Sequence, residues 1–479
     1  MVIDSRLKHA GMTSMTEKEL IEAIAEIARK KGWPVYLVGG YLRDRSLHRA
    51  CHDLDFVVEG DAIAFAKSVS QVLSLRPPIV YGRFGTAMLQ HQRITLEFAT
   101  ARKESYLHHS RKPIVSASTL QDDLARRDFT INTLALSLKD GRMVDLFGGR
   151  NDIKAKILRT PVEPEKTFFD DPLRMMRAVR FASRFNFSIH PQTAEAIIRN
   201  RERLKIVSQE RIADEFLRTM ETANPASSIV WMDRLQLLPL VLPEIERLKT
   251  VVAADDRNCK DVYRHTLIVL ERVSRNTKNV SVRLAALFHD IGKPTTQKYV
   301  PGQGWTFHDH PLVGTRIFNQ IAGRFNIGNP VRDKVSRLIE YHLRPHYLAG
   351  PGVDEDGASN RAIAHLVKDA GKNLKSLFIL ARADLTSKNE RKVDKGLNDI
   401  NLLEKKIKTW KKAQRSTIFK LAIDGNDIMK IMEIKPGPQV GRIKTDLEHL
   451  VLEEKIPNRK RDLKKYLEKL GVVPLRAEG

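Results

Sequence analysis

The sequence is poor in cysteine, because only Cys51 and Cys259 occur in 479 residues and they form no CxxC pair. This excludes a disulfide framework and a zinc knuckle, and it is typical of a protein of the reducing cytoplasm. No stretch approaches the roughly 18 consecutive apolar residues of a membrane span, and the N-terminus carries no signal-peptide core. We therefore expect a cytoplasmic protein made of several globular domains.

Aromatic residues are scarce as well, at 6%, whereas Lys and Arg outnumber Asp and Glu by 82 to 58, a formal charge of +24. This surplus suits a polyanionic partner, nucleic acid first and an anionic membrane surface second, although a basic proteome would also produce it. Proteins that read single-stranded RNA usually interleave aromatic with basic residues. The composition therefore favours recognition of shape and phosphates in a folded RNA.

Strand and helix signals divide the chain into an α/β part and a helical part. VYLVGG, LDFVV, TAMLQ and ITLEFAT read as strands, and Thr16 with Glu19 forms a capping box for a helix that Gly32 closes. From Thr167 onward the periodicity is 3.6 residues and strand signals are few. The predicted fold class is α+β, with an N-terminal α/β head followed by a mostly helical neck, body and tail.

Two aspartates one residue apart begin the strand LDFVV. Asp53 and Asp55 share one face of that strand, where two like charges need a cation between them. Mg²⁺ is commonly held by one or two carboxylates together with substrate phosphates. Upstream, LVGGYLRD places Gly39 and Gly40 where backbone N–H groups approach a phosphate that Arg43 also reaches. Alone, the DxD pair would equally fit a solvated turn.

Three linked segments resemble a known family. LVGGYLRD, DLDFVV and ARRDFTINTLAL are similar to the head of class II tRNA nucleotidyltransferases (CCA-adding enzymes) and bacterial poly(A) polymerases, within the DNA-polymerase-beta-like superfamily. The resemblance implies that Asp53 and Asp55 are catalytic and hold Mg²⁺. It also implies nucleotide binding by Gly39, Gly40, Arg43, Arg126, Arg127, Asp128 and Asn132. Glu97 would be a third carboxylate or an orienting group, and residues 102–118 resemble the flexible loop that affects the switch from C to A addition.

The segment DDPLRMMRAVRF predicts a site that selects the base. We expect Asp171 and Arg174 on one face of a helix, because residues i and i+3 are neighbours. A carboxylate accepts and a guanidinium donates, so this pair fits cytosine and adenine and rejects uracil and guanine. The segment resembles the EDxxR motif of the family with Asp170 at its first position, which implies that Arg177 and Arg180 also contact the nucleotide. A salt-bridged surface helix is the alternative.

A dispersed His/Asp series follows in YRHTL, LFHDIGKP, HDHPLVG, YHLRPH and RADLTSK. The candidate metal ligands are His265, His289, Asp290 and Asp384, with His310 and His342 able to hold a second metal. Imidazole and carboxylate together suit Mn, Ni, Fe, Co or Zn. The series resembles the HD phosphohydrolases in order and spacing, and it implies metal-dependent phosphodiesterase or phosphatase chemistry. An inactive, RNA-binding HD fold is the alternative.

A basic tail begins near residue 390. Its PGPQVG enters a helix, and Gly437, Pro438 and Gly441 would leave N–H groups free for an RNA phosphate. We predict four domains: the catalytic head (1–160), a helical neck with the templating and RNA-binding segments (161–245), the HD domain (246–395) and a tail that binds tRNA (396–479).

The whole pattern predicts an enzyme, a CCA tRNA nucleotidyltransferase with Mg²⁺, CTP, ATP and the tRNA 3′ end as its partners. A poly(A) polymerase, or an enzyme that adds only CC or only A, would share every one of these motifs. A protein whose main activity is that of an HD phosphohydrolase, with a head that only binds RNA, is the alternative from another class. The sequence does not specify the oligomeric state.

Overall fold

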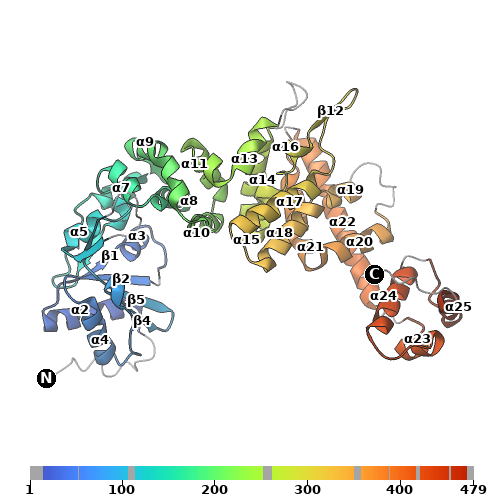
Figure 1. The fold of residues 1–479 in the computed structure, drawn as a ribbon, viewed down its shortest axis with the longest axis horizontal. Coiled ribbons are helices and arrows are strands. Elements are labelled where there is room, and N and C mark those ends of the chain that lie inside the picture. Colours follow the sequence, from blue (N-terminus) through green and yellow to red (C-terminus); the bar gives the residue numbers. More distant parts are fainter. Residues whose placement is uncertain are drawn as a thin grey trace.

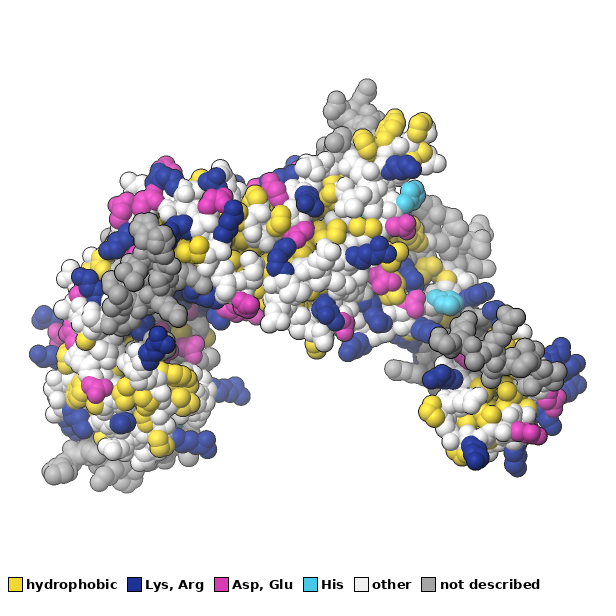
Figure 2. All heavy atoms as spheres, in the orientation of Figure 1, with side chains coloured by type: hydrophobic (Ala, Val, Ile, Leu, Met, Phe, Trp, Pro, Cys, Tyr) yellow, Lys and Arg dark blue, Asp and Glu magenta, His cyan; other side chains and the backbone are white. Residues whose placement is uncertain are grey.

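The computed structural model describes residues 15–51, 53–105, 114–251, 261–349, 358–387, 389–416, 421–452 and 455–471. The chain forms an arch, with the N-terminal head at one end and the C-terminal helices at the other (Figure 1). The space-filling view shows the hollow of this arch open to solvent between head and tail (Figure 2). None of the helices in these residues is long and apolar enough to cross a membrane.

The head is built on a seven-stranded sheet with the order β3-β4-β5-β2-β1-β8-β9. β2 runs parallel to β5 and antiparallel to β1, and its register places Asp55 directly beside Glu97. The predicted strands and the hairpin are therefore confirmed. The strands of the head are β1 (Val35–Val38), β2 (Asp53–Val58), β3 (Ile79–Tyr81), β4 (Thr86–His91), β5 (Ile94–Thr100), β6 (Arg102–Ser105), β7 (Ile114–Ala117), β8 (Ala135–Ser137), β9 (Met143–Val144) and β10 (Ile157–Leu158).

The first described helix of the head starts and stops where its capping residues predict. Both bonds of the capping box between Thr16 and Glu19 open α2, and Gly32 in the left-handed conformation closes it. The helices of the head are α2 (Glu17–Lys31), α3 (Gly40–Ser46), α4 (Ala62–Val72), α5 (Leu120–Ala125) and α6 (Gly149–Ala155).

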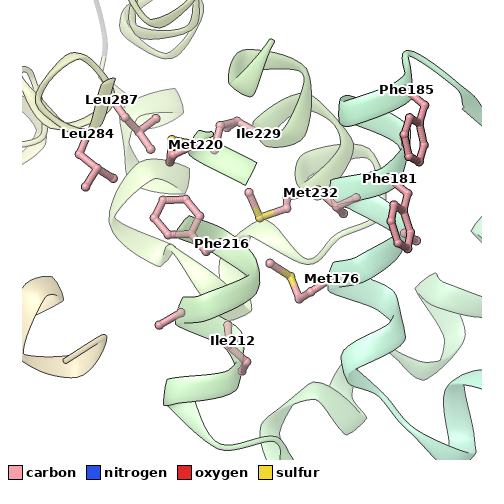
Figure 3. Packing of buried hydrophobic residues seen from close by; sticks show 14 of the residues in the cluster. Met176, Phe181, Phe185, Ile212, Phe216, Met220, Ile229, Met232, Leu284 and Leu287 are labelled. Atoms are coloured by element: carbon pink, nitrogen blue, oxygen red, sulfur yellow. The ribbon is translucent and has the colours of Figure 1, made fainter. Parts of the chain in front are cut away.

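The neck packs its helices around α8. In Figure 3, Met176 points from α8 toward Ile212 and Phe216 of α10, whereas Phe181 and Phe185 point away from α10. One face of α8 therefore belongs to the apolar core and the other face carries aromatic rings. The elements of the neck are α7 (Pro164–Asp170), α8 (Leu173–Phe185), β11 (Ser188–Ile189), α9 (Pro191–Asn200), α10 (Gln209–Met220), α11 (Pro225–Arg234), α12 (Leu238–Val241) and α13 (Pro243–Glu246).

The body and tail are helical, and the tail has a core of its own. One continuous cluster of buried apolar residues runs from α2 into α22, whereas a second one, which includes Ile428, Leu447 and Leu463, lies within the last helices. The elements are α14 (Val262–Asn276), α15 (Val280–Phe288), α16 (Lys293–Thr296), β12 (Lys298–Val300), β13 (Gly304–Thr306), α17 (His310–Arg324), α18 (Asn329–Tyr341), α19 (Arg344–Ala349), α20 (Asn360–Ala370), α21 (Leu374–Asp384), α22 (Glu390–Ser416), α23 (Gly425–Met432), α24 (Pro438–Leu452) and α25 (Lys460–Gly471).

A buried arginine joins the neck to the body. Arg283 of α15 is only 2% exposed, and its Nη1 donates to the carbonyl oxygens of Met220 and Thr222, at 2.5 and 2.8 Å. Its Nε donates to Thr277 O at 2.9 Å and its Nη2 to Ser274 O at 3.3 Å. Arg283 therefore satisfies carbonyls at the end of α10 and at the end of α14, two helices of different parts of the chain.

We predict that Arg283→Met destabilises the protein by roughly 3 kcal/mol or more, because buried carbonyl groups lose their donors and each such loss costs about 1–3 kcal/mol. The measurement is the urea midpoint of unfolding. Arg275→Met is the matched control, since Arg275 is exposed and pairs only with Glu271 on its own helix; its effect should stay under about 0.5 kcal/mol. Equal effects of the two substitutions would contradict this account of the joint.

Candidate functional site

The first strand residues of β2 crowd negative charge at one edge of the head. Asp53 is exposed, Asp55 is half-buried one residue further on, and Glu97 stands beside Asp55 on β5. The pKa of Asp55 is raised to about 6, chiefly by burial; the carboxylates of Glu97 and Asp53 also raise it, and Arg127 and Arg43 act in the opposite direction. Such a cluster favours a bound cation. Asp53 and Asp55 therefore fit the predicted metal site in geometry and charge.

The turn after β1 brings backbone and arginine side chains to these carboxylates. Gly39 has a φ of +67°, and a Cβ there would lie 2.6 Å from Nη1 of Arg127. Glycine is therefore favoured by the conformation, and a Cβ there would also displace the Arg127 guanidinium. The Gly39 N–H donates to Leu134 O at 2.9 Å, which leaves phosphate contacts to Gly40 and to Arg43.

The RRDxxxN segment is held together by its own carboxylates. Asp123, a fully buried residue that sequence reasoning missed, accepts from Arg126 Nη2 at 2.5 Å and from Arg127 Nη2 at 3.1 Å. Asp128 accepts from Asn132 Nδ2 at 2.8 Å. Its buried carboxylate is engaged by the protein, so Asp128 fits a positioning role better than direct nucleotide contact.

A buried relay of hydrogen bonds continues from Asp128 into the neck. Arg177 Nε donates to Asp128 Oδ2 at 2.7 Å, and Arg177 Nη1 lies 3.6 Å from Glu215 Oε1 of α10. Glu215 Oε2 also accepts from Arg180 Nε at 2.5 Å. Burial would raise the pKa of Asp128, but Arg177 and Asn132 lower it to about 2. At the head end, Asn132 Oδ1 accepts from Nη1 of Arg43.

The predicted helix through Asp170, Asp171 and Arg174 is wrong in one respect. Asp170 ends α7, Asp171 is extended with φ −137° and ψ 98°, and α8 begins at Leu173. The reason is Pro172, because a residue that precedes proline avoids the helical region. Asp171 and Arg174 therefore do not share a helix face, although both reach the same cavity.

Contacts in the chain fix the orientation of this pair. Arg174 donates from Nη2 to Arg126 O at 2.5 Å and from Nη1 to Thr167 O at 3.3 Å. Asp171 Oδ2 lies 3.4 Å from Nη2 of Arg211, another residue that sequence reasoning missed. Arg211 stands on α10, about forty positions from the motif, where no local pattern points to it.

One cavity of about 480 Å³ brings most of the predicted residues of the head and neck together. It has Asp55 on the head side and the Asp171–Arg174 segment on the neck side. Asp53, Gly39 and Arg180 do not line it. The predicted residues that line it are Gly40, Arg43, Asp55, Arg126, Arg127, Asp128, Asn132, Asp171, Arg174 and Arg177.

Histidines and carboxylates also converge between the helices of the body. Asp290 lies two residues after the end of α15, and its Oδ2 lies 3.6 Å from His265 Nε2 and 3.3 Å from His289 Nε2. Asp384, the last residue of α21, has Oδ1 3.0 Å from His265 Nε2 and 3.5 Å from His289 Nε2. The four predicted ligands therefore lie together, and three of them, His265, His289 and Asp290, form a group that could hold a metal.

A second group shares Asp290 with the first. Asp290 Oδ1 lies 3.4 Å from His310 Nε2, which is 3.4 Å from His342 Nε2. The two carboxylate oxygens of Asp290 thus face different sets of imidazoles, as in a bridged pair of metals. His346, which sequence reasoning did not select, places Nε2 3.4 Å from Asp384 Oδ2; its signal was the i+4 spacing from His342.

The tautomers of these histidines suit metal binding. A carbonyl only accepts, so an imidazole Nδ1 that contacts one carries the hydrogen and leaves Nε2 free as a ligand. Three candidates have Nδ1 within 2.7–2.9 Å of a backbone oxygen: His289 of Ala286, His310 of Phe307 and His342 of Ile339.

The charges of the cluster also call for a cation. Burial lowers the pKa of His342 to about 3. Burial would likewise lower the pKa of His289, but the carboxylates of Asp290 and Asp384 raise it to about 10. Positive charge is therefore strongly stabilised among these carboxylates, and a divalent metal would supply it.

Profiles of four domain families match successive parts of the chain. They describe a poly A polymerase head domain (residues 35–159), a "Probable RNA and SrmB-binding site of polymerase A" (186–249), an HD domain (262–389) and a tRNA nucleotidyltransferase domain 2 (391–467).

The curated relatives carry related names. The Multifunctional CCA protein of Shewanella frigidimarina is 33% identical over 323 residues, which are 65% of this chain and 74% of that protein. The chain belongs to the family of CCA-adding tRNA nucleotidyltransferases with an HD domain. A second relative, the A-adding tRNA nucleotidyltransferase of Deinococcus radiodurans, is 29% identical over 333 residues, which are 68% of this chain and 73% of that protein.

Solved structures share the fold of this CCA-adding family member. The CCA-adding enzyme of Bacillus stearothermophilus, solved in complex with CTP, superposes with a TM-score of 0.65 at 22% identity and covers 96% of this chain and 98% of its own. The predicted family, the α+β fold class and the assignment as a nucleotidyltransferase are thereby confirmed. Membership also implies dependence on divalent metal. The roles of the individual residues and the domain boundaries stay predictions.

Two further predictions from the sequence concern the loop 102–118 and the PGPQVG segment of the tail. The ends of the loop 102–118 pair as β6 and β7, and residues 106–113 of the loop lie outside the described residues. Cys259 lies outside them too. In the tail, α24 begins at Pro438 within PGPQVG, as the sequence predicts.

We predict that the HD cluster of this CCA-adding family member binds two equivalents of Mn²⁺ or Ni²⁺ after dialysis, measured by elemental analysis. Asp290→Asn should lose both equivalents, because Asp290 contacts both groups of ligands, whereas His342→Ala should lose one. His308→Ala is the control, since His308 is exposed and belongs to neither group. Retention of two equivalents by Asp290→Asn would rule out the bridged arrangement.

Proposed function

We propose that the enzyme adds C, C and A to the 3′ end of tRNA, using CTP and ATP and releasing pyrophosphate. The observation that carries this proposal is that a single cavity has a carboxylate of the metal-binding strand, Asp55, on one side and the base-reading pair Asp171 and Arg174 on the other. A nucleotide in this cavity would have its phosphates at the head and its base at the neck.

The reaction is in-line displacement at phosphorus. The RNA 3′-hydroxyl attacks the α-phosphate of the bound nucleotide, and the bond to the leaving pyrophosphate breaks. Asp53 and Asp55 would hold Mg²⁺, which when bound neutralises charge on the attacking and leaving oxygens. Arg43 and Arg127 lie beside these carboxylates and would orient the phosphates.

Base selection follows from hydrogen-bond chemistry at the neck. Asp171 accepts from the amino group of cytosine or adenine, and Arg174 donates to the adjacent ring nitrogen. Uracil and guanine present a ring N–H to Arg174 and leave polar groups unpaired, which a desolvated site penalises strongly. The carbonyls of Thr167 and Arg126 hold the Arg174 guanidinium in place for this contact.

The RNA partner is assigned from charge and from the tail. The net charge of +24 favours phosphate contacts, and Figure 2 shows Lys and Arg side chains along the head, the body and the tail. Gly437, Pro438 and Gly441 at the start of α24 are candidates for a backbone contact with the folded tRNA. Two cysteines without a disulfide pattern are consistent with action in the cytoplasm.

A second candidate function rests on the His/Asp cluster. A metal held by His265, His289, Asp290 and Asp384 would activate water for attack on a phosphate ester. Lys293 Nζ lies 2.7 Å from Asp290 Oδ2 and would add positive charge next to the scissile group. We propose metal-dependent phosphoester hydrolysis as a separate activity of the HD domain, with Mn, Ni, Fe, Co or Zn as candidate ions.

We predict that the protein, incubated with Mg²⁺ and a tRNA transcript that lacks its 3′ end, adds three nucleotides when CTP and ATP are both present and then stops. Product length is read at single-nucleotide resolution. A long run of A would indicate a poly(A) polymerase, and arrest after two C or one A would indicate a split-activity enzyme.

The matched variants separate the two active sites. Asp55→Asn should lower the rate of addition by at least about a hundredfold, because a preorganised charge at the reacting centre is lost, while phosphoester hydrolysis persists. His289→Ala should do the opposite. A folded variant that lost both activities would refute the assignment of two independent sites.

A further inference from the structure

A second cavity, of about 750 Å³, lies beside the nucleotide cavity at the junction of head and neck. The mechanism above makes no use of it. Its charged lining consists of four arginines, Arg49, Arg180, Arg184 and Arg218, and two acids, Asp214 and Glu221. Asp214 pairs with Arg218 at 3.0 Å and Arg180 pairs with Glu215 at 2.5 Å, which leaves Arg49 and Arg184 as the arginines of the lining that these two acids do not neutralise.

Two stacked rings of α8 hold the guanidiniums at this corner of the head and neck. Phe181 and Phe185, which Figure 3 shows on the face of α8 away from α10, stack at 5.7 Å with an interplanar angle of 8°. Arg43 lies 4.8 Å from the Phe185 ring centre, and Arg49 and Arg184 lie 5.1 and 5.3 Å from it. Phe181 lines the nucleotide cavity, whereas Arg180 and Arg184 of the same helix line the second cavity.

Positive charge is crowded around Arg184 at one end of the second cavity. Arg184 Nη2 lies 3.4 Å from Asp44 Oδ2, but burial and the neighbouring Arg43, Arg180 and Arg49 together lower the pKa of Arg184. Arg49 is exposed, and within the described part of the chain no carboxylate forms an ion pair with it. Its Nη2 donates only to the carbonyl oxygen of Arg184, at 3.0 Å. A site of this kind attracts an anion.

The position of Arg49 in the chain places the second cavity near the point where the RNA 3′-hydroxyl would approach the carboxylates. Arg49 lies in the short connection from α3 to β2, four residues before Asp53, and Cys51 Sγ in the same connection donates to Asp53 O at 3.4 Å. Asp53 is exposed and lies outside the nucleotide cavity, so its open side is where the second substrate can reach the carboxylates. Arg177 lines the nucleotide cavity and Arg184 lines the second cavity. They are seven residues apart on α8, or about 10 Å, a distance that a short length of RNA strand spans.

We propose that this second cavity binds the backbone phosphate of the RNA strand next to its reacting 3′ end, with Arg49 and Arg184 as the phosphate ligands. The proposal rests on the nucleotide-addition function above and assigns the approach of the RNA strand to it. It places the RNA next to Asp53, at the start of strand β2, and the incoming nucleotide next to Asp55, further along the same strand. A free phosphate compound, above all the product pyrophosphate, offers the same chemistry and is distinguished in the test.

The test compares Arg49→Gln with Arg45→Gln. Arg45 is an exposed arginine of α3 that does not line either cavity. Arg45→Gln therefore removes the same charge from the same region without changing the cavity. Equilibrium binding of a tRNA that lacks its 3′ end is measured without nucleotide, at several salt concentrations. Arg49→Gln should weaken binding roughly fivefold to tenfold and lower the slope of log affinity against log salt by about 0.7–0.9, the value for one lost phosphate contact. Arg49→Lys should restore the slope.

Three further results would overturn the proposal. Unchanged RNA binding in Arg49→Gln, or loss equal to that in Arg45→Gln, would mean that no phosphate of the RNA occupies the cavity. A weaker inhibition by pyrophosphate in Arg49→Gln without any change in RNA binding would assign the cavity to the product. Because binding is measured without catalysis, a wild-type protein that binds RNA but adds no nucleotide would refute the proposed function and leave this test intact.

Discussion

The ion pair between Asp128 of the head and Arg177 of the neck is the constraint on which the nucleotide site depends. Asp128 is buried and Arg177 is half-buried, and each has a further partner, Asn132 on one side and Glu215 on the other. Buried pairs of this kind add little net stability compared with apolar packing, but breaking one leaves an uncompensated charge. Their value here is geometric, because they fix the distance between metal-binding strand and base-reading pair.

The arrangement of the molecule extends this principle to longer range. The core is continuous from the head through the neck into the body, and Arg283 closes the joint between α10 and the helices that lead to His289 and Asp290. The tail has a separate core. The two candidate active sites therefore stand on one packed framework, whereas the tail is packed around a core of its own.

The sequence predicts those parts of the site that local chemistry determines. Asp53 and Asp55 begin the strand that follows the glycine turn and its helix, and each HD ligand falls within a short motif, so local patterns together with the family resemblance point to them. The structure departs from expectation where a long-range contact or a proline determines the position of a side chain. Pro172 breaks the predicted helix between Asp171 and Arg174, and Arg180 turns from the nucleotide toward Glu215. Arg211 and Glu215 come from another helix, which no local pattern indicates.

The central claim is that one site, shared by head and neck, holds either C or A. The most direct measurement is equilibrium binding of labelled CTP with the other nucleotides as competitors, in the absence of RNA. The account predicts one equivalent of CTP per chain, displaced completely by ATP and hardly at all by UTP or GTP, with the discrimination lost in Asp171→Ala. Simultaneous binding of CTP and ATP, or unchanged selectivity in Asp171→Ala, would contradict it.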